Sequence, residues 1–273
     1  MGDAVHRHSP ANGLGSNTSI QDGFNLAWKL SLVIKGRAQP QLLESFDAER
    51  RPVGEQVVAR ATKSFMANAM MWDLFGAGIV IKKTPEERAA LFTTAQGRAQ
   101  LYQALDAEMP PMWHAHGVEM TRRYQSAAVV PDGSPEPLQT RDAEIYHEPS
   151  ARPGSAVPHA WLVRREPSPC VSTLDLAGKD RFHLFTGHGG SSWREAAAEV
   201  SSRFGVEIGV TAIGPQLDYE DPYGTWRRTC DVAVDGCVLV RPDLIVAWRS
   251  HSLRDEPAQS LGDAMDRILG YAT

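Results

Sequence analysis

The sequence predicts an α/β fold in two parts: a mainly helical part over residues 1–150, then a part over 151–273 in which short strands alternate with helices. Apolar residues recur at three- and four-residue steps from Ile20 onward, which is the period of an amphipathic helix. After residue 158, short apolar runs alternate with glycine-rich turns and helical patterns. Between these parts, residues 124–158 are rich in Pro, Gly, Ser and charge, which indicates an extended connection that contains the domain boundary.

The first stretch is a loop that leads into a helix. Its turn formers are Pro10, Asn12, Gly13 and Gly15. We expect Ser16, Asn17 and Thr18 to cap the helix by accepting hydrogen bonds from its first N–H groups, and Gly36 to end it. The stripe predicted to face the core is Ile20, Phe24, Ala27, Trp28 and Ser31, widened by Leu30, Val33 and Ile34.

Two further helical segments follow. Residues 40–71 carry a helical apolar pattern, and Pro52 is expected to bend or restart that helix. The apolar stretch 65–81 is compatible with an aromatic substrate pocket, but core packing is the preferred interpretation. Thr84, Pro85 and Glu87 form a strong helix start, and the helix is expected to end before Pro110.

The last part has a different order. Strands are expected at 160–163, 172–175, 182–186 and 206–213, and a hairpin at 238–249. Helices are expected through Trp193 to Phe204 and over 261–269. This order suits a thioredoxin-like layer. Thiol–disulfide exchange is excluded, because no Cys pair stands at the helix start after Gly187, so packing and subunit contact are the expected roles.

Composition bounds the function. The chain has 273 residues, 42% of them hydrophobic and 22% charged, with a formal charge of −5. No basic run with interleaved aromatics suggests nucleic-acid binding, and no apolar run approaches the roughly 20 residues of a membrane span. The three widely spaced cysteines indicate neither a disulfide framework nor a zinc site. We therefore expect a reduced, cytoplasmic setting with no nucleic-acid or membrane partner.

The order of residues in the first stretch is more specific than any single pattern. It runs through Gly2-Asp3, His6, Pro10, Gly13-x-Gly15-x-Asn17, Asp22 and Asn25. This order resembles the second FAD-contact motif of the flavin-dependent aromatic hydroxylases, most closely their phenol and chlorophenol monooxygenase branch. The continuation through Leu42-Leu43 and Glu49-Arg50-x-Pro52 agrees, as do Leu239 to Asp243 and Trp248-Arg249. Glu49 and Arg50 are expected to be structural.

The resemblance implies a role for each residue of the motif. Asp3 would hold the ribityl hydroxyls of FAD, and Pro10 would lie against the isoalloxazine ring. Backbone N–H groups from Gly13 to Asn17 would face the pyrimidine edge of the ring, where negative charge gathers. No residue is assigned a catalytic role. The cofactor-binding residues implied are Gly2, Asp3, Pro10, Gly13, Leu14, Gly15, Ser16 and Asn17.

The resemblance also implies an activity. In the family, NAD(P)H reduces FAD, O2 adds to the flavin C4a, and the resulting peroxide delivers oxygen to a small phenol-like substrate. The family's strand-Gly-x-Gly-x-x-Gly-helix unit, which grips the ADP half of FAD, has no counterpart in the sequence. We therefore expect the C-terminal half of a hydroxylase, with an incomplete FAD-hydroxylase portion before the thioredoxin-like domain, and a homodimer.

Two alternatives from other classes stay open. One is a non-catalytic interaction protein, a thioredoxin-like dimerisation module with a helical arm and no flavin. The other is a metal-dependent enzyme built on Asp3, His6 and His8, although no companion ligand stands at a convincing metal spacing.

Overall fold

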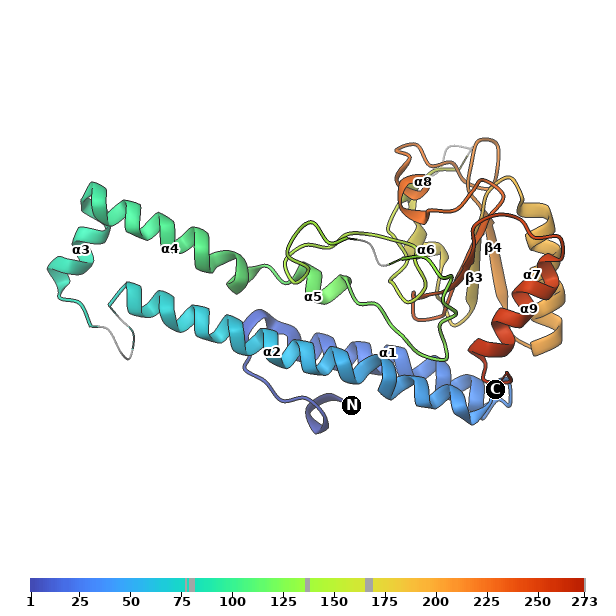
Figure 1. Ribbon diagram of the computed structural model, residues 1–273, viewed down its shortest axis with the longest axis horizontal. Coiled ribbons are helices and arrows are strands. Elements are labelled where there is room, and N and C mark those ends of the chain that lie inside the picture. The colour runs from blue at the N-terminus through green and yellow to red at the C-terminus, as the bar shows by residue number, and fades with distance from the viewer. Residues whose placement is uncertain (77, 79–81, 136–137, 165–168, 273) are drawn as a thin grey trace. The chain divides into compact units, whose positions relative to one another are not determined.

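A computed structural model describes residues 1–76, 78, 82–135, 138–164 and 169–272 (Figure 1). They form two compact units, each made of several chain segments. Unit 1 comprises Met1–Asp22, Pro52–Thr121 and Gln139–His147, and unit 2 comprises Gly23–Arg51, Arg122–Leu138 and Glu148–Thr273. Helices α1 (Leu14–Ile34) and α2 (Glu44–Leu74) each contribute residues to both units.

Helix α1 begins earlier than the capping pattern predicts. Two short 3-10 turns, η1 (Gly2–Ala4) and η2 (Ala11–Gly13), precede it. The expected caps lie inside its first two turns, where Asn17 Nδ2 donates to the Gly13 carbonyl at 3.1 Å and Thr18 Oγ1 donates to the Leu14 carbonyl at 2.7 Å. The predicted capping role of these two residues is therefore wrong, because the turn ends at Asn12 and Gly13, which both have positive φ. Gly36 follows the helix in the left-handed region, as expected.

The buried face of α1 is not the predicted apolar stripe. Ile20 is 69% exposed and Phe24 is 50% exposed, so the stripe prediction is wrong for them, although Trp28 is buried. The buried face consists of Leu14, Thr18, Asp22, Asn25, Trp28 and Lys29. Polar side chains can occupy it because they find partners there, and a buried polar group with partners costs little.

Helix α2 follows η3 (Pro40–Leu43) and continues through Pro52, so the helix does not restart at that residue. Its buried apolar residues in unit 1 are Val53, Val57, Ala61, Ala67 and Met71. Core packing was the preferred interpretation of the stretch 65–81. It is wrong for Phe65, Met66, Met70 and Trp72, all of which are exposed. Residues 79–81 of that stretch lie outside the described part of the chain.

The predicted helix from residue 84 is two helices, α3 (Pro85–Thr93) and α4 (Ala95–Trp113), followed by α5 (His116–Met120). The capping box between Thr84 and Glu87 is confirmed. The helix divides at Thr94, whose hydroxyl accepts from the Gly97 N–H at 2.9 Å and so caps α4. A Cβ at Gly97 would lie 2.0 Å from the Ala90 carbonyl oxygen, so α3 approaches α4 closely at this glycine. Helix α4 runs past Pro110, beyond its expected end.

Unit 2 contains a four-stranded sheet in the order β4-β3-β5-β6. Its strands are β3 (Phe182–Thr186), β4 (Ile208–Ala212), β5 (Cys237–Val240) and β6 (Val246–Ser250). Strands β3 and β4 are parallel, and the other neighbouring pairs are antiparallel. All four strands fall within or overlap their predicted ranges, because short apolar runs between turn residues mark buried strands well.

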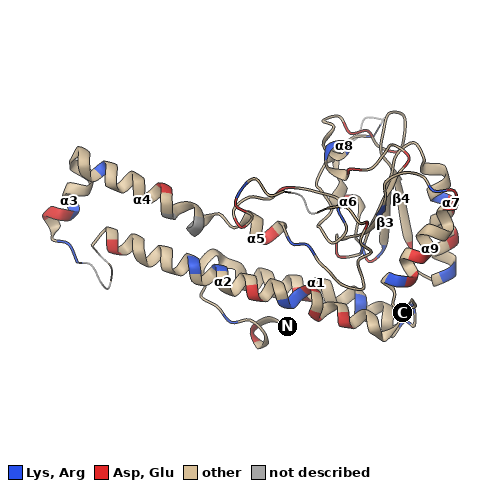
Figure 2. Ribbon diagram, in the orientation of Figure 1, with Lys and Arg blue, Asp and Glu red and all other residues tan. Residues whose placement is uncertain are grey.

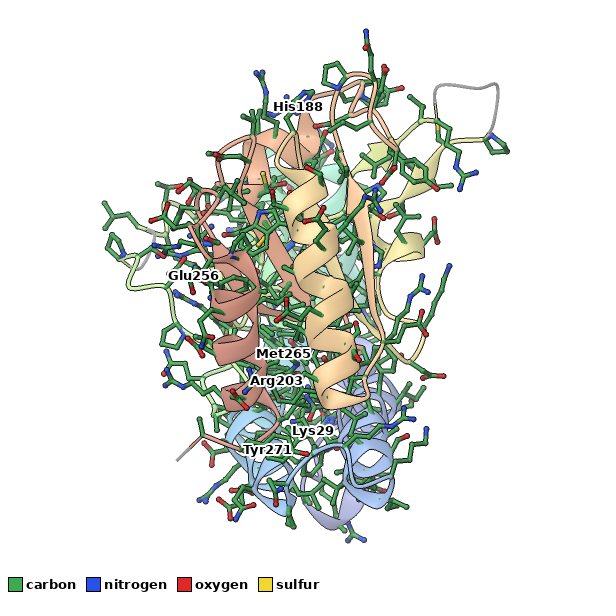
Figure 3. All side chains as sticks on the ribbon, turned by 90° about the vertical axis from the view of Figure 1, so that its right-hand side faces the viewer. Lys29, His188, Arg203, Glu256, Met265 and Tyr271 are labelled. Atoms are coloured by element: carbon green, nitrogen blue, oxygen red, sulfur yellow. The ribbon has the colours of Figure 1, made fainter. Side chains whose placement is uncertain are left out.

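The pleat of the sheet separates two apolar clusters. Leu184 and Leu239 face one cluster, whereas Phe185 and Val238 face the other. Helices α7 (Gly190–Phe204) and α9 (Pro257–Ile268) lie side by side over the first cluster (Figure 3), and α8 (Thr225–Cys230), which the sequence did not predict, borders the second. Acidic and basic residues both occur along α7 and α9 (Figure 2).

The remaining elements of unit 2 are short. Strands β1 (Trp161–Leu162) and β2 (Val171–Ser172) form a small antiparallel pair. The expected strand at 172–175 ends at Ser172 because this residue caps α6 (Thr173–Leu176). Residues 126–129 form a turn. No helix in the described residues is long and apolar enough to cross a membrane.

Candidate functional site

The first stretch of the chain is anchored by a buried pair in unit 1. His6 Nε2 lies 2.9 Å from Asp22 Oδ2, and the backbone N–H of Gly2 donates to the same oxygen at 3.1 Å. Both side chains are buried. The His6 ring also lies against Gly54 of α2, where a Cβ would approach it to 3.4 Å. These contacts hold the first stretch of the chain against α1 and α2.

A cleft of about 570 Å³ lies beside this loop in unit 1. The loop contributes Pro10, Ala11, Asn12 and Gly13; α2 contributes Ser64, Asn68 and Trp72, and α4 contributes Trp113. The Ser9 hydroxyl donates to the Ala61 carbonyl at 3.4 Å and accepts from the Ala11 N–H at 3.2 Å, which holds the loop on α2. Two indole rings with a few amide and hydroxyl groups suit a planar ligand that has polar edges.

The amino end of α1 directly follows the part of the loop that lines this cleft. Leu14 to Asn17 form its first turn, and N–H groups in a first turn have no carbonyl partner within an α-helix. Together with the helix dipole they favour negative charge in front of them. The Leu14 side chain is buried, whereas the side chains of Ser16 and Asn17 are exposed. What this helix end can offer a ligand is thus mainly its backbone.

The structure divides the predicted cofactor residues into groups. Pro10 and Gly13 line the cleft, and Leu14, Gly15, Ser16 and Asn17 begin α1 beside it. Gly2 is tied to Asp22, and Asp3 is an exposed residue of η1 that does not line the cleft. The roles implied for these residues stay predictions.

The sequence predicted no ligand contact for Ser64, Asn68 and Trp113, whereas Trp72 lies in the stretch 65–81 that was compatible with a substrate pocket. Ser64, Asn68 and Trp72 recur at four-residue steps on α2, a signal that could have placed them on one face. Trp113 carries no such signal, because the fold of α4 brings it there. The pairing of His6 with Asp22 was likewise missed, although both residues belong to the motif.

Unit 2 holds a buried cluster of four charges that ties its segments together. Lys29 Nζ lies 2.9 Å from Glu49 Oε2, Arg241 Nη1 lies 2.6 Å from Glu49 Oε1, and Arg241 Nη2 lies 2.6 Å from Asp243 Oδ2. Asn25 donates to Glu49 at 2.7 Å and to Asp243 at 3.0 Å. Two cations and two carboxylates balance in this cluster, as buried charges require.

The pKa shifts in this cluster follow from burial and pairing. Burial raises the pKa of Glu49, but Arg241 and Lys29 outweigh it and hold that pKa well below its usual range. Burial lowers the pKa of Lys29 to about 8, although Glu49 opposes the shift. The Arg50 guanidinium donates to the Tyr124 hydroxyl at 2.7 Å. These contacts support the expectation that Glu49 and Arg50 are structural.

Comparison with known proteins gives matches at both ends of the chain. Residues 1–61 match the family described as "FAD binding domain", and residues 150–272 match "Aromatic-ring hydroxylase, C-terminal". The 2,4-dichlorophenol 6-monooxygenase of Delftia acidovorans is 46% identical over 277 residues, which cover 98% of this chain and 46% of that enzyme. The chain belongs to the FAD-binding aromatic-ring hydroxylase family.

Other hydroxylases of the family match over nearly the whole chain. The phenol 2-monooxygenase of Pseudomonas sp. (strain EST1001) is 39% identical over 97% of this chain and 44% of its own length. The flavin-dependent monooxygenase PieE, solved with FAD and substrate, is 41% identical with a TM-score of 0.87, over 99% of this chain and 47% of that one. The chain therefore spans about half the length of the hydroxylases it matches.

The metal alternative requires Asp3, His6 and His8 as ligands of one ion. His6 is engaged by Asp22, and Asp3 is exposed. In the described ranges, no three His, Cys, Asp or Glu side chains are grouped as they would be around a metal ion.

Proposed function

We propose that residues 2–17 hold the isoalloxazine end of FAD in a monooxygenase that hydroxylates phenol-like rings. The observation that carries the proposal is the cleft at Pro10 and Gly13, from which the chain passes directly into the first turn of α1. First-turn N–H groups suit the pyrimidine edge of a flavin, which carries negative charge when the ring is reduced. The indoles of Trp72 and Trp113 add flat apolar walls to the same cleft.

The remaining residues of the loop would orient the cofactor. Asp3 is exposed on η1, so its carboxylate is free to accept hydrogen bonds from two ribityl hydroxyls. The pair between His6 and Asp22 would position Gly2 and Asp3 by holding the loop on α1. When bound, the flavin, reduced by NAD(P)H, would supply the activation of O2 and the transfer of oxygen to the aromatic substrate. The residues of this chain would bind and orient the cofactor and exclude water from the site.

For residues 151–273 we propose a thioredoxin-like domain that packs and makes subunit contacts in a cytoplasmic homodimer. The parallel pair of β3 and β4, followed by the antiparallel strands β5 and β6, supports this assignment. The boundary at about residue 150 and the status of the chain as the C-terminal half of a hydroxylase belong to the same proposal. Its match to about half of its relatives' length supports the latter.

The test is a flavin titration of the purified chain, followed by fluorescence quenching with FAD and, in parallel, with FMN. We expect binding of FAD, and at least about tenfold weaker binding for Asp3→Asn, because a hydrogen bond to a charged group contributes about 1.5–3 kcal/mol. Asp47→Asn is the matched control, since Asp47 is an exposed carboxylate on the part of α2 that belongs to unit 2.

A folded chain that binds neither flavin would contradict the proposal and favour the non-catalytic interaction module. Equal FAD binding by the Asp3→Asn variant and the wild type would remove the assigned role of Asp3 alone. If FAD binds, oxidation of NADH and NADPH in the presence of phenols is the next measurement.

A further inference from the structure

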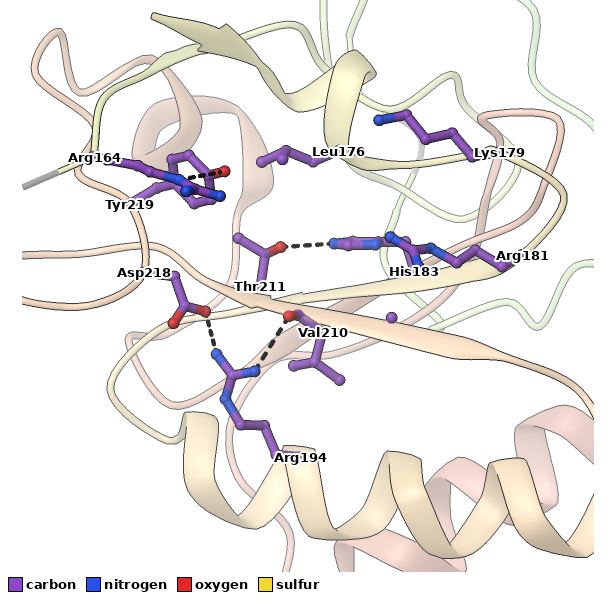
Figure 4. A pocket seen from close by; sticks show the side chains of 11 residues that line it. Arg164, Leu176, Lys179, Arg181, His183, Arg194, Val210, Thr211, Asp218 and Tyr219 are labelled. Carbon is purple, nitrogen blue, oxygen red and sulfur yellow. Dashed lines mark hydrogen bonds and ion pairs between the residues drawn. The ribbon is translucent and has the colours of Figure 1, made fainter. Parts of the chain in front are cut away.

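A second pocket, about 690 Å³ in volume, lies in unit 2 near the amino end of β3 (Figure 4). Four cationic side chains line it: Arg164 from the segment after β1, Lys179 and Arg181 from the loop before β3, and Arg194 from α7. Leu176 and the ring of Tyr219 form its apolar wall. The flavin proposal uses none of these residues.

The positive charge of this pocket is only half neutralised. Arg194 pairs with Asp218, and Arg181 Nη1 lies 2.6 Å from Glu207 Oε1. Arg164 Nε donates to the Tyr219 hydroxyl at 3.0 Å, a neutral partner, and within the described ranges neither Arg164 nor Lys179 forms an ion pair with a carboxylate. Four cations and two carboxylates leave about two positive charges facing the cavity.

Two buried nitrogen atoms in the pocket have no partner among the described residues. They are His183 Nδ1 and Arg181 Nε. His183 is 3% exposed, and its other ring nitrogen lies 2.9 Å from Thr211 Oγ1. Both unpaired atoms face the same place on β4: a Cβ at Gly209 would lie 2.8 Å from His183 Nδ1 and 3.1 Å from Arg181 Nε. The two nitrogens therefore pack against Gly209, where any larger residue would displace them.

The protonation state of His183 suits an acceptor ligand. Burial and the nearby Arg181 and Lys179 lower the pKa of His183 to about 4, so the ring is neutral near pH 7. If the Thr211 hydroxyl donates to Nε2, the proton of the neutral ring lies on Nδ1, which is then a buried donor without a partner among the described residues. Unsatisfied buried donors of this kind need an explanation, and an acceptor in the pocket provides one.

We propose that this pocket binds a phosphate-type dianion, either inorganic phosphate or the phosphate group of a phosphomonoester. The excess of about two positive charges matches a dianion, and guanidinium groups are well suited to phosphate oxygens. His183 Nδ1 and Arg181 Nε are the two donors that would complete the coordination of the anion. Leu176 and Tyr219 would contact the organic part of a monoester.

The experiment is calorimetric titration of the whole chain with inorganic phosphate and with phenyl phosphate, at constant ionic strength in a chloride buffer. The pocket variants are Arg164→Gln and Lys179→Gln. Both residues are exposed, so neither substitution disturbs the core. The matched control is Arg203→Gln, which removes an arginine of α7 paired with Asp266 outside the pocket. We expect each pocket variant to bind about tenfold more weakly, and the control to bind like the wild type.

The two ligands distinguish the two sources of phosphate. Tighter binding of phenyl phosphate indicates a monoester, whereas equal or weaker binding indicates free phosphate. Absence of binding by either ligand would overturn the inference, and so would equal affinity of the wild type and both pocket variants. The flavin titration is independent of these outcomes, so the two proposals fail separately.

Discussion

Glu49 is a buried carboxylate that forms ion pairs with two cations. Its two oxygens accept from Lys29 and Arg241, and Ser126 Oγ donates to it at 2.6 Å. Removing one member of such a cluster leaves the others buried without compensation, which costs more than the pair contributes. The arrangement therefore behaves as a single unit.

We predict that Glu49→Gln destabilises the chain by about 3–5 kcal/mol, because Lys29 and Arg241 lose their shared carboxylate. Urea denaturation followed by circular dichroism measures this. Glu44→Gln, at an exposed carboxylate on the same helix, is the control and should change stability by about 1 kcal/mol or less. Equal effects of the two substitutions would contradict the role assigned to Glu49.

His183 makes stability depend on pH. Its folded-state pKa is about 4 and its ordinary value is 6.5, so between these values the unfolded chain binds the additional proton. Stability should therefore fall as pH decreases from 6.5 to 4, by up to about 3 kcal/mol from this group. The His183→Gln variant lacks this titrating group. As pH falls through this range, the unfolding free energy of the variant should therefore approach or exceed that of the wild type. Parallel pH profiles would refute the prediction; buffers without phosphate keep the pocket ligand out of the comparison.

At the scale of elements, glycines in helices have opposite roles in different places. Gly23 lies within α1, and a Cβ there would meet no other atom within 4 Å. Gly97 lies in the first turn of α4, where a Cβ would clash with the backbone of Ala90 and Leu91. The first glycine only raises the entropy of the unfolded chain, whereas the second permits the approach of two helices.

Gly23→Ala should therefore stabilise the chain by about 0.5–1 kcal/mol, and Gly97→Ala should destabilise it by at least about 1 kcal/mol. Thermal and urea unfolding of both variants test the pair, each serving as the control for the other. Stabilisation by Gly97→Ala would mean that α3 and α4 do not approach each other closely at this point.

At the scale of the whole molecule, apolar burial is unevenly distributed between the units. Both large apolar clusters, which contain Leu184 and Phe185 respectively, lie in unit 2. In unit 1, helices α2, α3 and α4 expose the aromatic residues Phe65, Trp72, Phe92 and Trp113. Fewer buried apolar contacts mean a lower free energy of local opening.

We predict that backbone amides of α4 exchange hydrogen for deuterium faster than those of β3, which is buried at all five positions. Mass spectrometry of the exchanging chain resolves the two segments. Addition of FAD should slow exchange in residues 2–17 and leave β3 unchanged, because a ligand stabilises the state that it binds. Protection of α4 equal to that of β3 would contradict the first expectation, and an unchanged loop would count against the flavin proposal.

Local patterns predicted those elements whose causes are local. The capping box at Thr84 depends on residues three apart, and the strand at 182–186 is a short apolar run bounded by turn residues. The resemblance of the residues from Gly2 to Asn17 to an FAD-contact motif predicts the candidate flavin loop. In contrast, the apolar period of α1 indicated the wrong face, because Asn25 and Lys29 are buried with partners that lie elsewhere in the chain.

The sequence by itself determined the family and the order of most elements, and it predicts the candidate flavin loop, since each rests on neighbouring residues. Only the tertiary structure decided which groups meet across long separations: Arg241 with Glu49, Trp113 with Pro10, and His183 and Arg181 beside Gly209. The physical reason is that a buried polar side chain is stabilised by partners in space. The hydrophobic periodicity of the sequence does not indicate where those partners lie.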